Sequence, residues 1–287
     1  MTKLGNVGVG GKNPIRIMGI LNTSPESFYK KSIKTTKQNI SNTIKKMELD
    51  GADFIDVGGM STAPYLSTLV SEKLEFNRIS NAIKIIQNVS NLPISVDTCR
   101  ASVAKSALDL GADIINDISG LKYDNKMIDV ISNYYPSLIL CSFDTKRVSG
   151  NQTTTKNLLK QSIDILKKIG FPSNKIVLDP AIGFFRKSGK GSFFTKIRSD
   201  GFVRDLQVIQ NLRSIKQKYP ILISVSNKSF IGKLLGKENP NERLFGSIAA
   251  EVVSVLNGAD IIRTHNVLET KDAVVVASKL SHRNKGL

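Results

Sequence analysis

The chain has 287 residues, of which 40% are hydrophobic, so it is long enough for one α/β barrel and too apolar for a disordered chain. Its net charge of +17 would suit a nucleic-acid or membrane partner, but the lysines are scattered, no basic tract is interleaved with aromatic residues, and tryptophan is absent. We therefore expect a solvated basic surface that attracts anionic substrates, with no nucleic-acid partner and no membrane partner.

The sequence also predicts a compartment. It contains no apolar run of about 18 residues, and its N-terminus lacks the charged-then-apolar order of a signal peptide, so we expect neither a membrane span nor a secretion signal. The two cysteines, Cys99 and Cys141, lie beside apolar runs and have no metal-binding spacing. These features favour a cytoplasmic protein with reduced thiols.

Strands and helices are predicted to alternate along the chain. Residues 1–14 are rich in glycine and are expected to form a flexible arm before one domain over 15–287. Apolar runs predict strands at 15–22, 53–58, 93–97, 113–117, 137–142, 175–179, 220–225 and 260–264. Helical periodicity predicts helices at 35–50, 71–90, 100–110, 125–134, 156–169, 203–219, 229–256 (with a break near Pro240) and 267–281. This alternation favours a single (β/α)8 TIM barrel, although a doubly wound open sheet could use the same order.

Two other features support repeated βα units. Gly51, Gly111 and Gly258 are each followed by Ala-Asp and an apolar run, which is the pattern of a helix end joined directly to a strand. After the sixth strand, residues 183–201 form the longest irregular stretch and are rich in glycine and basic side chains. A loop of that length on the catalytic face of a barrel is usually functional.

Polar residues stand where several predicted strands end. Asp97, Asn116 and Asp179 close three different strands, and Lys228 follows a fourth. Each one alone could simply cap a helix. In a barrel, however, the carboxyl ends of all strands meet on one face. Together the four side chains suit a flat heterocycle with donor and acceptor edges, such as a 2-amino-4-oxo ring.

The last predicted strand carries Arg263 and His265, two residues apart, so both side chains can point the same way. Two such donors at the catalytic mouth of a barrel suit a phosphate or diphosphate, and the alternative is a purely structural pair. The glycine-rich stretches 8–11 and 183–191 have neither a dinucleotide-binding nor a P-loop pattern.

Seven motifs, kept in order from about residue 15 to 280, closely resemble the dihydropteroate synthase family of pterin-binding barrels. They are IMGILNTSPESF (17–28), DVGG (56–59), SVDT (95–98), GADIINDISG (111–120), DPAIGF (179–184), SNKSFIG (226–232) and RTH (263–265). The resemblance implies a folate-pathway transferase. Such an enzyme joins hydroxymethyl-dihydropterin diphosphate to 4-aminobenzoate and releases diphosphate with the help of Mg²⁺. It also implies a homodimer.

The same resemblance implies roles for individual residues. The matches to the pterin contacts are Asp97, Asn116, Asp179 and Lys228. Asn22 matches the ligand of the metal and the diphosphate, and Arg263 and His265 match anion binders. Asn22, Asp97, Lys228, Arg263 and His265 are the expected catalytic set. The loop 23–28 would close over the arylamine together with Ser61 and Thr62, and Ser229 would line the arylamine site. Asp56 and Phe184, inside matched motifs, are also expected at the substrates.

Departures from the family pattern gather at the arylamine and diphosphate end. After the second strand the family usually has Glu-Ser-Thr-Arg-Pro-Gly, whereas this chain has Met60, Ala63 and Tyr65, so the usual arginine is missing. Asn227 replaces an arginine after the seventh strand, and residues 141–143 replace Met-His-Met after the fifth. The arylamine could therefore be 4-aminobenzoate or a larger relative, such as a ribosylated arylamine.

Two other functions stay open. A methyltransferase of the same superfamily would use a methylated reduced pterin, but it would not need Asn22, Arg263 and His265 arranged for diphosphate. A basic barrel without enzymatic activity would bind nucleic acid in a salt-dependent way. Release of diphosphate from a pterin diphosphate would separate these functions from a synthase.

Overall fold

A closed barrel of parallel strands forms the centre of the computed structural model, which describes residues 1–25, 36–64 and 69–281. Around the ring the strands follow the order β11-β12-β3-β4-β5-β6-β7-β8, and a parallel bridge between Leu178 and Ile221 joins the two ends. The strands are β3 Arg16–Asn22, β4 Phe54–Gly58, β5 Ile94–Asp97, β6 Ile114–Asp117, β7 Ser137–Cys141, β8 Ile176–Asp179, β11 Leu222–Ile223 and β12 Ile261–Thr264. The predicted strands and the TIM barrel are confirmed.

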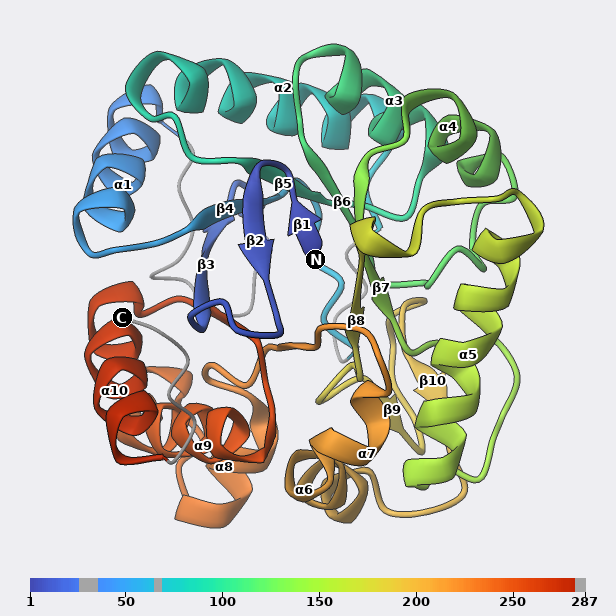
Figure 1. The fold of residues 1–287 in the computed structure, drawn as a ribbon, viewed down its shortest axis with the longest axis vertical. Helices are drawn as coiled ribbons and strands as arrows, with labels where there is room; N and C mark the ends of the chain where they lie inside the picture. The colour runs from blue at the N-terminus through green and yellow to red at the C-terminus, as the bar shows by residue number, and fades with distance from the viewer. Residues whose placement is uncertain (26–35, 65–68, 282–287) are drawn as a thin grey trace.

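Helices surround this barrel on all sides (Figure 1). They are α1 Lys37–Leu49, α2 Glu72–Val89, α3 Ala101–Asp109, α4 Met127–Tyr134, α5 Gln152–Lys168, α6 Gly201–Gln210, α7 Leu212–Lys216, α8 Ser229–Leu235, α9 Leu244–Asn257 and α10 Val267–Leu280, with short 3-10 turns at Ser173–Lys175 and Pro240–Glu242. The predicted break near Pro240 is confirmed, whereas the helix expected over 203–219 is divided into α6 and α7. In α1 the residues Ile40, Ile44 and Met47 face the core, as their spacing predicts.

The three repeated glycines make the predicted helix-to-strand junctions. Gly51, Gly111 and Gly258 have φ values of 88°, 92° and 120°, which side-chain-bearing residues rarely adopt. Each therefore ends a helix and lets the next strand begin within a few residues. Strand register then aligns the polar ends, because Asp97 pairs with Gly58 on one side and with Asn116 on the other.

The prediction of a flexible arm over residues 1–14 is wrong for most of that segment. Residues Thr2–Leu4 (β1) and Val7–Val9 (β2) form an antiparallel hairpin that lies across the centre of the ring in Figure 1. Leu4 and Val9 are buried in a cluster with residues of the barrel interior such as Met18 and Phe54. The hairpin therefore closes the amino-terminal end of the barrel. Strands of three residues are too short for a periodic pattern, so the sequence did not reveal them.

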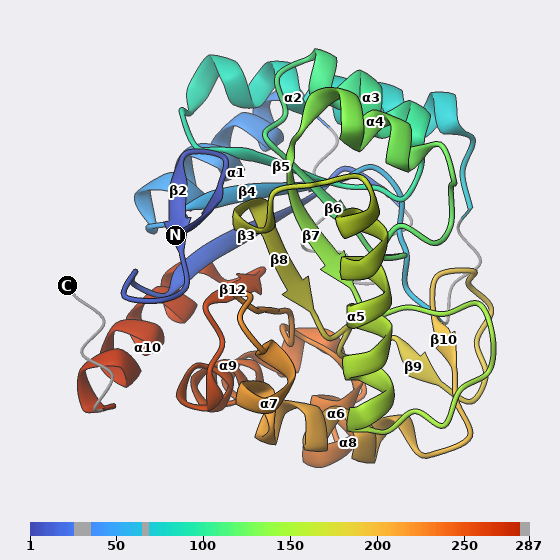
Figure 2. The same cartoon turned by 45° about the vertical axis from the view of Figure 1, so that its right-hand side comes forward.

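The long stretch after β8 also contains structure. Phe185–Arg186 (β9) and Thr195–Lys196 (β10) pair in parallel beside α5 and α6 (Figure 2). Phe185 and Phe193 are buried in a cluster that includes Met60 and Cys141. In addition, the Pro64 carbonyl accepts hydrogen bonds from the backbone N–H groups of residues 190 and 191, at 2.9 and 3.0 Å. This insertion is thus packed onto the loop that follows β4.

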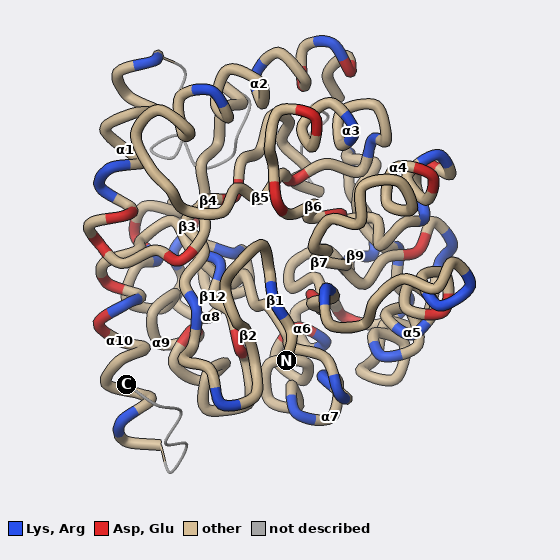
Figure 3. Tube along the Cα trace, turned by 45° about the horizontal axis from the view of Figure 1, so that its top comes forward, with Lys and Arg blue, Asp and Glu red and all other residues tan. Residues whose placement is uncertain are grey.

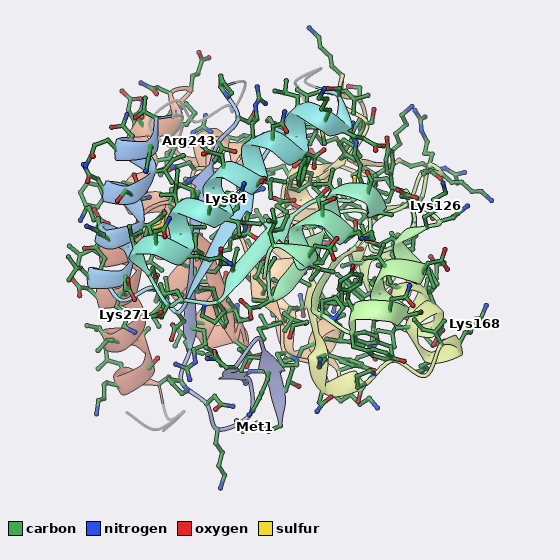
Figure 4. All side chains as sticks on the ribbon, turned by 90° about the horizontal axis from the view of Figure 1, so that it is seen from above. Met1, Lys84, Lys126, Lys168, Arg243 and Lys271 are labelled. Atoms are coloured by element: carbon green, nitrogen blue, oxygen red, sulfur yellow. The ribbon has the colours of Figure 1, made fainter. Side chains whose placement is uncertain are left out.

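Basic and acidic residues are distributed along helices and loops all around the barrel (Figure 3). Lys84 on α2, Lys126 before α4 and Lys168 at the end of α5 are exposed and lie well apart (Figure 4). The expected scatter of basic residues over helix faces is therefore confirmed. Within the described ranges, no helix is both long and apolar enough to cross a bilayer.

Candidate active site

Two adjoining cavities open at the carboxyl ends of the strands. We call the first the mouth cavity, of about 80 Å³; its lining includes Asn22, Ser24, Met60, Ser61, Thr62, Ala63, Pro64, Asp97, Gly183, Phe184, Arg186, Lys228, Ser229, Arg263 and His265. The second, the inner cavity, shares part of this lining and adds Asn116, Ile118, Cys141, Asp179, Ala181, Ile182 and Ser224. Every predicted site residue except Asp56 therefore lines one of the two. Asp56 is fully buried beneath them.

Arg263 joins two carboxylates at the floor of the site. Its Nε donates to Asp56 Oδ2 at 2.6 Å, and its Nη2 donates to Asp97 Oδ2 at 2.9 Å. Asp56 also accepts from Ser95 Oγ at 2.6 Å and, more weakly, from Asn116 Nδ2 at 3.3 Å. Asp56 therefore supports the site from below by orienting Arg263 and Asn116, and it does not face the cavities itself.

Asp97 is the carboxylate that faces both cavities. Burial raises its pKa to about 7; the positive charge of Arg263 opposes this shift, and the negative charge of Asp56 adds to it. Asp97 can therefore exchange a proton near neutral pH. A carboxylate in that environment is ionised most easily when a ligand donates N–H groups to it.

Lys228 and Asp179 also line the inner cavity. The Lys228 ammonium sits 4.2 Å above the ring of Phe184, and burial lowers the pKa of this lysine to about 8. Asp179 accepts the backbone N–H of Ala181 at 2.7 Å, and burial raises its pKa. The carboxylate thus holds the turn after β8 as well as lining the cavity. Asp179 can therefore both stabilise this turn and accept hydrogen bonds from a ligand in the cavity.

His265 is uncharged at neutral pH, because burial and then the positive charges of Arg263 and Lys228 lower its pKa to about 3. It lines the mouth cavity, so it can offer one N–H donor to an anion but no positive charge. Arg263 and Lys228 are therefore the stronger candidates for charge neutralisation.

The mouth cavity contains a cation that sequence reasoning missed. Arg186, from β9, donates from Nη2 to Ser229 Oγ at 2.7 Å and from Nε to the Gly183 carbonyl at 3.2 Å. Ala63, which stands where the family usually has arginine, is buried in the same lining. A guanidinium thus reaches this cavity from the insertion after β8. The basic character of residues 183–201 was the available signal, but it did not single out Arg186.

Asn227 lies outside the cavities. Its φ of 56° is left-handed, a conformation that asparagine tolerates better than most residues. Its N–H donates to Ser247 Oγ at 2.9 Å, and its carbonyl accepts from Arg243 Nη1 at 3.0 Å. The exchange of arginine for asparagine at this position therefore changes the support of the Lys228 loop and adds nothing to the cavity walls.

Charged side chains hold the loop after β4 at both of its ends. Glu75 on α2 accepts from Arg100 Nη1 and from Thr98 Oγ1, both at 2.7 Å. Arg100 also donates to the Val70 carbonyl at 2.8 Å, and Arg78 donates to the Gly59 carbonyl at 3.1 Å. The loop that carries Thr62 and Pro64 is therefore anchored to the strand end of Asp97. Its Tyr65, like residues 26–28 of the first loop, lies outside the described residues.

The described part of the chain has no cluster of three or more His, Cys, Asp or Glu side chains that could enclose a metal ion. The amide of Asn22 offers one hard oxygen in the mouth cavity. Magnesium is usually held by one or two protein oxygens together with substrate phosphates and water. This lining therefore fits a Mg²⁺ ion that arrives with a diphosphate.

Comparison with known proteins points to one family. The family described as pterin binding enzyme matches residues 18–265. The dihydropteroate synthase of Clostridium beijerinckii is 36% identical over 270 residues, which is 93% of this chain and 94% of that protein. The dihydropteroate synthase of Bacillus subtilis is 35% identical, over 89% of this chain and 85% of that protein.

Solved structures agree with this result. A dihydropteroate synthase from Clostridium difficile, crystallised in the presence of pteroic acid, superposes with a TM-score of 0.82 at 34% identity, covering 99% of this chain and 100% of that one. The Xanthomonas albilineans dihydropteroate synthase with 4-aminobenzoic acid gives 0.81 at 27% identity, covering 94% of each chain. The resemblance that the motifs carry thus extends over the whole barrel.

Proposed function

Because the chain belongs to the pterin-binding enzyme family, we propose that it is a dihydropteroate synthase, which joins hydroxymethyl-dihydropterin diphosphate to 4-aminobenzoate and releases diphosphate. The observation that carries this proposal is the inner cavity, whose wall combines Asp97, Asn116, Asp179 and Lys228. Carboxylates, an amide and an ammonium around one apolar slot match the alternating donors and acceptors of a pterin ring.

Binding of the pterin uses the two carboxylates as acceptors. Asp97 and Asp179 would take N–H groups from the guanidine-like edge of the ring, and Asn116 would supply both a donor and an acceptor. Asp97 becomes ionised as it accepts these bonds, so its proton is released on binding at or below neutral pH. The ring would then lie close to Lys228, whose ammonium already packs on Phe184.

The departing diphosphate would be stabilised at the mouth cavity. When the bond to diphosphate breaks, positive charge develops on the benzylic-type carbon of the pterin, so the enzyme must stabilise the leaving anion. Arg263 and Lys228 supply positive charge there, and His265 supplies a neutral donor. Mg²⁺ would be held by the Asn22 oxygen and by the diphosphate, and it would neutralise part of the leaving group's charge.

The arylamine would occupy the outer part of the mouth cavity. Thr62 and Pro64 provide one wall, Phe184 an aromatic wall, and Ser229 with Arg186 a polar end suited to the benzoate carboxylate. In this orientation the amine points toward the pterin carbon. Alignment of the two reactants, rather than a covalent intermediate with the protein, then accounts for the rate.

The test is diphosphate release from the pterin diphosphate with and without 4-aminobenzoate. A synthase releases diphosphate in proportion to the arylamine consumed, and Asp97→Asn removes this activity together with pterin binding. Neither the methyltransferase nor a non-enzymatic barrel releases diphosphate, so a lack of diphosphate release would argue against a synthase.

We also propose that the enzyme is a cytoplasmic homodimer. The adjacent helices α9 and α10 carry large apolar side chains that are exposed, including Phe245 at 83%, Leu280 at 80% and Val276 at 57%. A face of this kind on one chain is suited to a symmetric partner. Light scattering should give twice the monomer mass, and Phe245→Asp should halve the measured mass, whereas the control Leu74→Asp on α2 should not.

The proposed cytoplasmic location is supported by the two free, buried cysteines, Cys99 and Cys141, which fit a reducing compartment.

A further inference from the structure

A third cavity, which we call the outer groove, lies beside the mouth cavity. It has a volume of about 490 Å³ and is formed between β9, α6 and α8. Phe202 and Phe230 contribute apolar surface, and Arg186, Lys187 and Lys233 contribute cations. It offers more room than the mouth cavity itself, which has about 80 Å³. Nothing in the proposed reaction so far uses it.

The outer groove is continuous with the arylamine end of the mouth cavity. Gly183, Arg186 and Ser229 line both. Arg186 donates to the other two, at 3.2 Å to the Gly183 carbonyl and at 2.7 Å to Ser229 Oγ, so its guanidinium stands at the junction. A substituent that extends the para end of the arylamine past Ser229 would therefore enter the outer groove.

Positive charge prevails in the outer groove. Its two carboxylates are both engaged by neighbours. Asp205 pairs with Arg204 at 2.8 Å and accepts the Gly183 N–H at 2.9 Å. Asp200 caps α6 by accepting the Phe202 N–H at 2.8 Å through Oδ1, and its Oδ2 forms a long, exposed ion pair with Lys233 Nζ at 3.9 Å. Arg186, Lys187 and Lys233 still outnumber the two carboxylates. Lys233 stands 4.3 Å above the Phe202 ring, so a cation lies directly over the apolar surface. An apolar floor under a basic rim suits a short chain that ends in an anionic group.

We propose that the outer groove is a subsite for an anionic tail, a carboxylate or a phosphate, carried at the para position of the arylamine. This inference rests on the proposed synthase activity and extends its substrate class to para-extended aminobenzoates. Lys187 and Lys233 bind the tail, and Arg186 lies at the point where the tail leaves the mouth cavity.

The experiment compares matched amines at saturating pterin diphosphate. The amines are 4-aminobenzoate as the reference, its glycine amide with a free carboxylate, the corresponding aminomethylphosphonate amide, and a neutral amide of the same length. The enzymes are the wild type, the double variant Lys187→Gln/Lys233→Gln, and the control Lys196→Gln, whose exposed lysine on β10 lies outside the outer groove.

The wild type should favour at least one anionic amide over the neutral amide by fivefold or more in kcat/KM, which is about 1 kcal/mol. The double variant should reduce this ratio below twofold, the control should leave it unchanged, and added salt should weaken it. The two anionic arms distinguish a carboxylate tail from a phosphate tail. A ratio below twofold in the wild type for both arms, or a ratio that survives the double substitution, overturns the inference while leaving the reaction of 4-aminobenzoate intact. If no amine reacts, including 4-aminobenzoate, the proposed function fails and the inference fails with it.

Discussion

The pKa of Asp97 predicts how pterin binding responds to pH. Burial raises this pKa to about 7, so the carboxyl is protonated in mildly acidic solution and ionised above neutrality. A protonated carboxyl directs an O–H toward the N–H donors of the pterin and cannot accept from them at that oxygen. Only the ionised form is therefore competent, and binding at low pH must expel the proton.

The magnitude follows from the titration. At one pH unit below its pKa about nine-tenths of a carboxyl group is protonated, so the apparent Kd rises about tenfold, or about 1.4 kcal/mol. Between pH 8 and pH 6 we therefore expect pterin affinity to fall about tenfold. Above pH 8 Lys228, with a pKa of about 8, loses its charge and diphosphate binding weakens. His265 does not contribute, because its pKa of about 3 lies far below this range.

Calorimetry with pteroic acid from pH 5.5 to 8.5, in buffers of different ionisation enthalpy, measures both the affinity and the proton released. Asp97→Asn should bind pteroic acid too weakly to measure at any of these pH values. The wild-type pH dependence should persist in Glu251→Gln, because the buried Glu251 on α9 also has a pKa raised to about 7 but lies behind Thr264 and Thr270, away from both cavities. A Kd that stays constant from pH 5.5 to 7.5 in the wild type would refute the assignment of Asp97 as the acceptor.

Three further predictions concern residues that support the site. Arg263→Ala should raise the inhibition constant of diphosphate at least tenfold. Because Asp56 is then left buried without its cation, the variant should also lose about 3 kcal/mol of unfolding free energy in urea. An inhibition constant that changes less than twofold would mean that other groups bind the anion. Glu75→Gln should raise the KM of the arylamine several-fold at unchanged pterin affinity, since Arg100 would lose the negative charge that holds it beside the loop after β4. A parallel loss of pterin binding would contradict this role. Leu4→Ala should cost about 3 kcal/mol of unfolding free energy with pterin Kd unchanged, whereas a cost below about 0.5 kcal/mol would mean that the hairpin contributes little to the core.

The sequence predicted those parts of the fold that follow from a local pattern repeated along the chain. Strand periodicity and the glycines that end three of the helices indicate the barrel, and a parallel barrel brings Asp97, Asn116 and Asp179 to one face. These residues could therefore be found without coordinates.

What the sequence did not reveal depends on contacts between distant segments. Arg186 reaches the mouth cavity from a two-residue strand that only tertiary contacts stabilise, and Glu75 pairs with Arg100 across 25 positions of a chain rich in charged residues. The pairing of Arg263 with two carboxylates also depends on contacts between distant segments. The sequence motif predicted that this arginine binds diphosphate, and it gave no reason to expect Asp56 as its partner.

The two hydrogen bonds that join the insertion after β8 to the Pro64 carbonyl come from backbone N–H groups. Any residue except proline can supply the N–H group at position 190, so the side chain there is free to diverge. Gly189 is not, because a Cβ at that position would stand 2.5 Å from the same carbonyl. Selection can therefore change the charge of the neighbouring outer groove through positions such as Lys187 while the walls of the mouth cavity keep their shape. Preference for different arylamine tails could evolve here separately from the chemistry of the pterin.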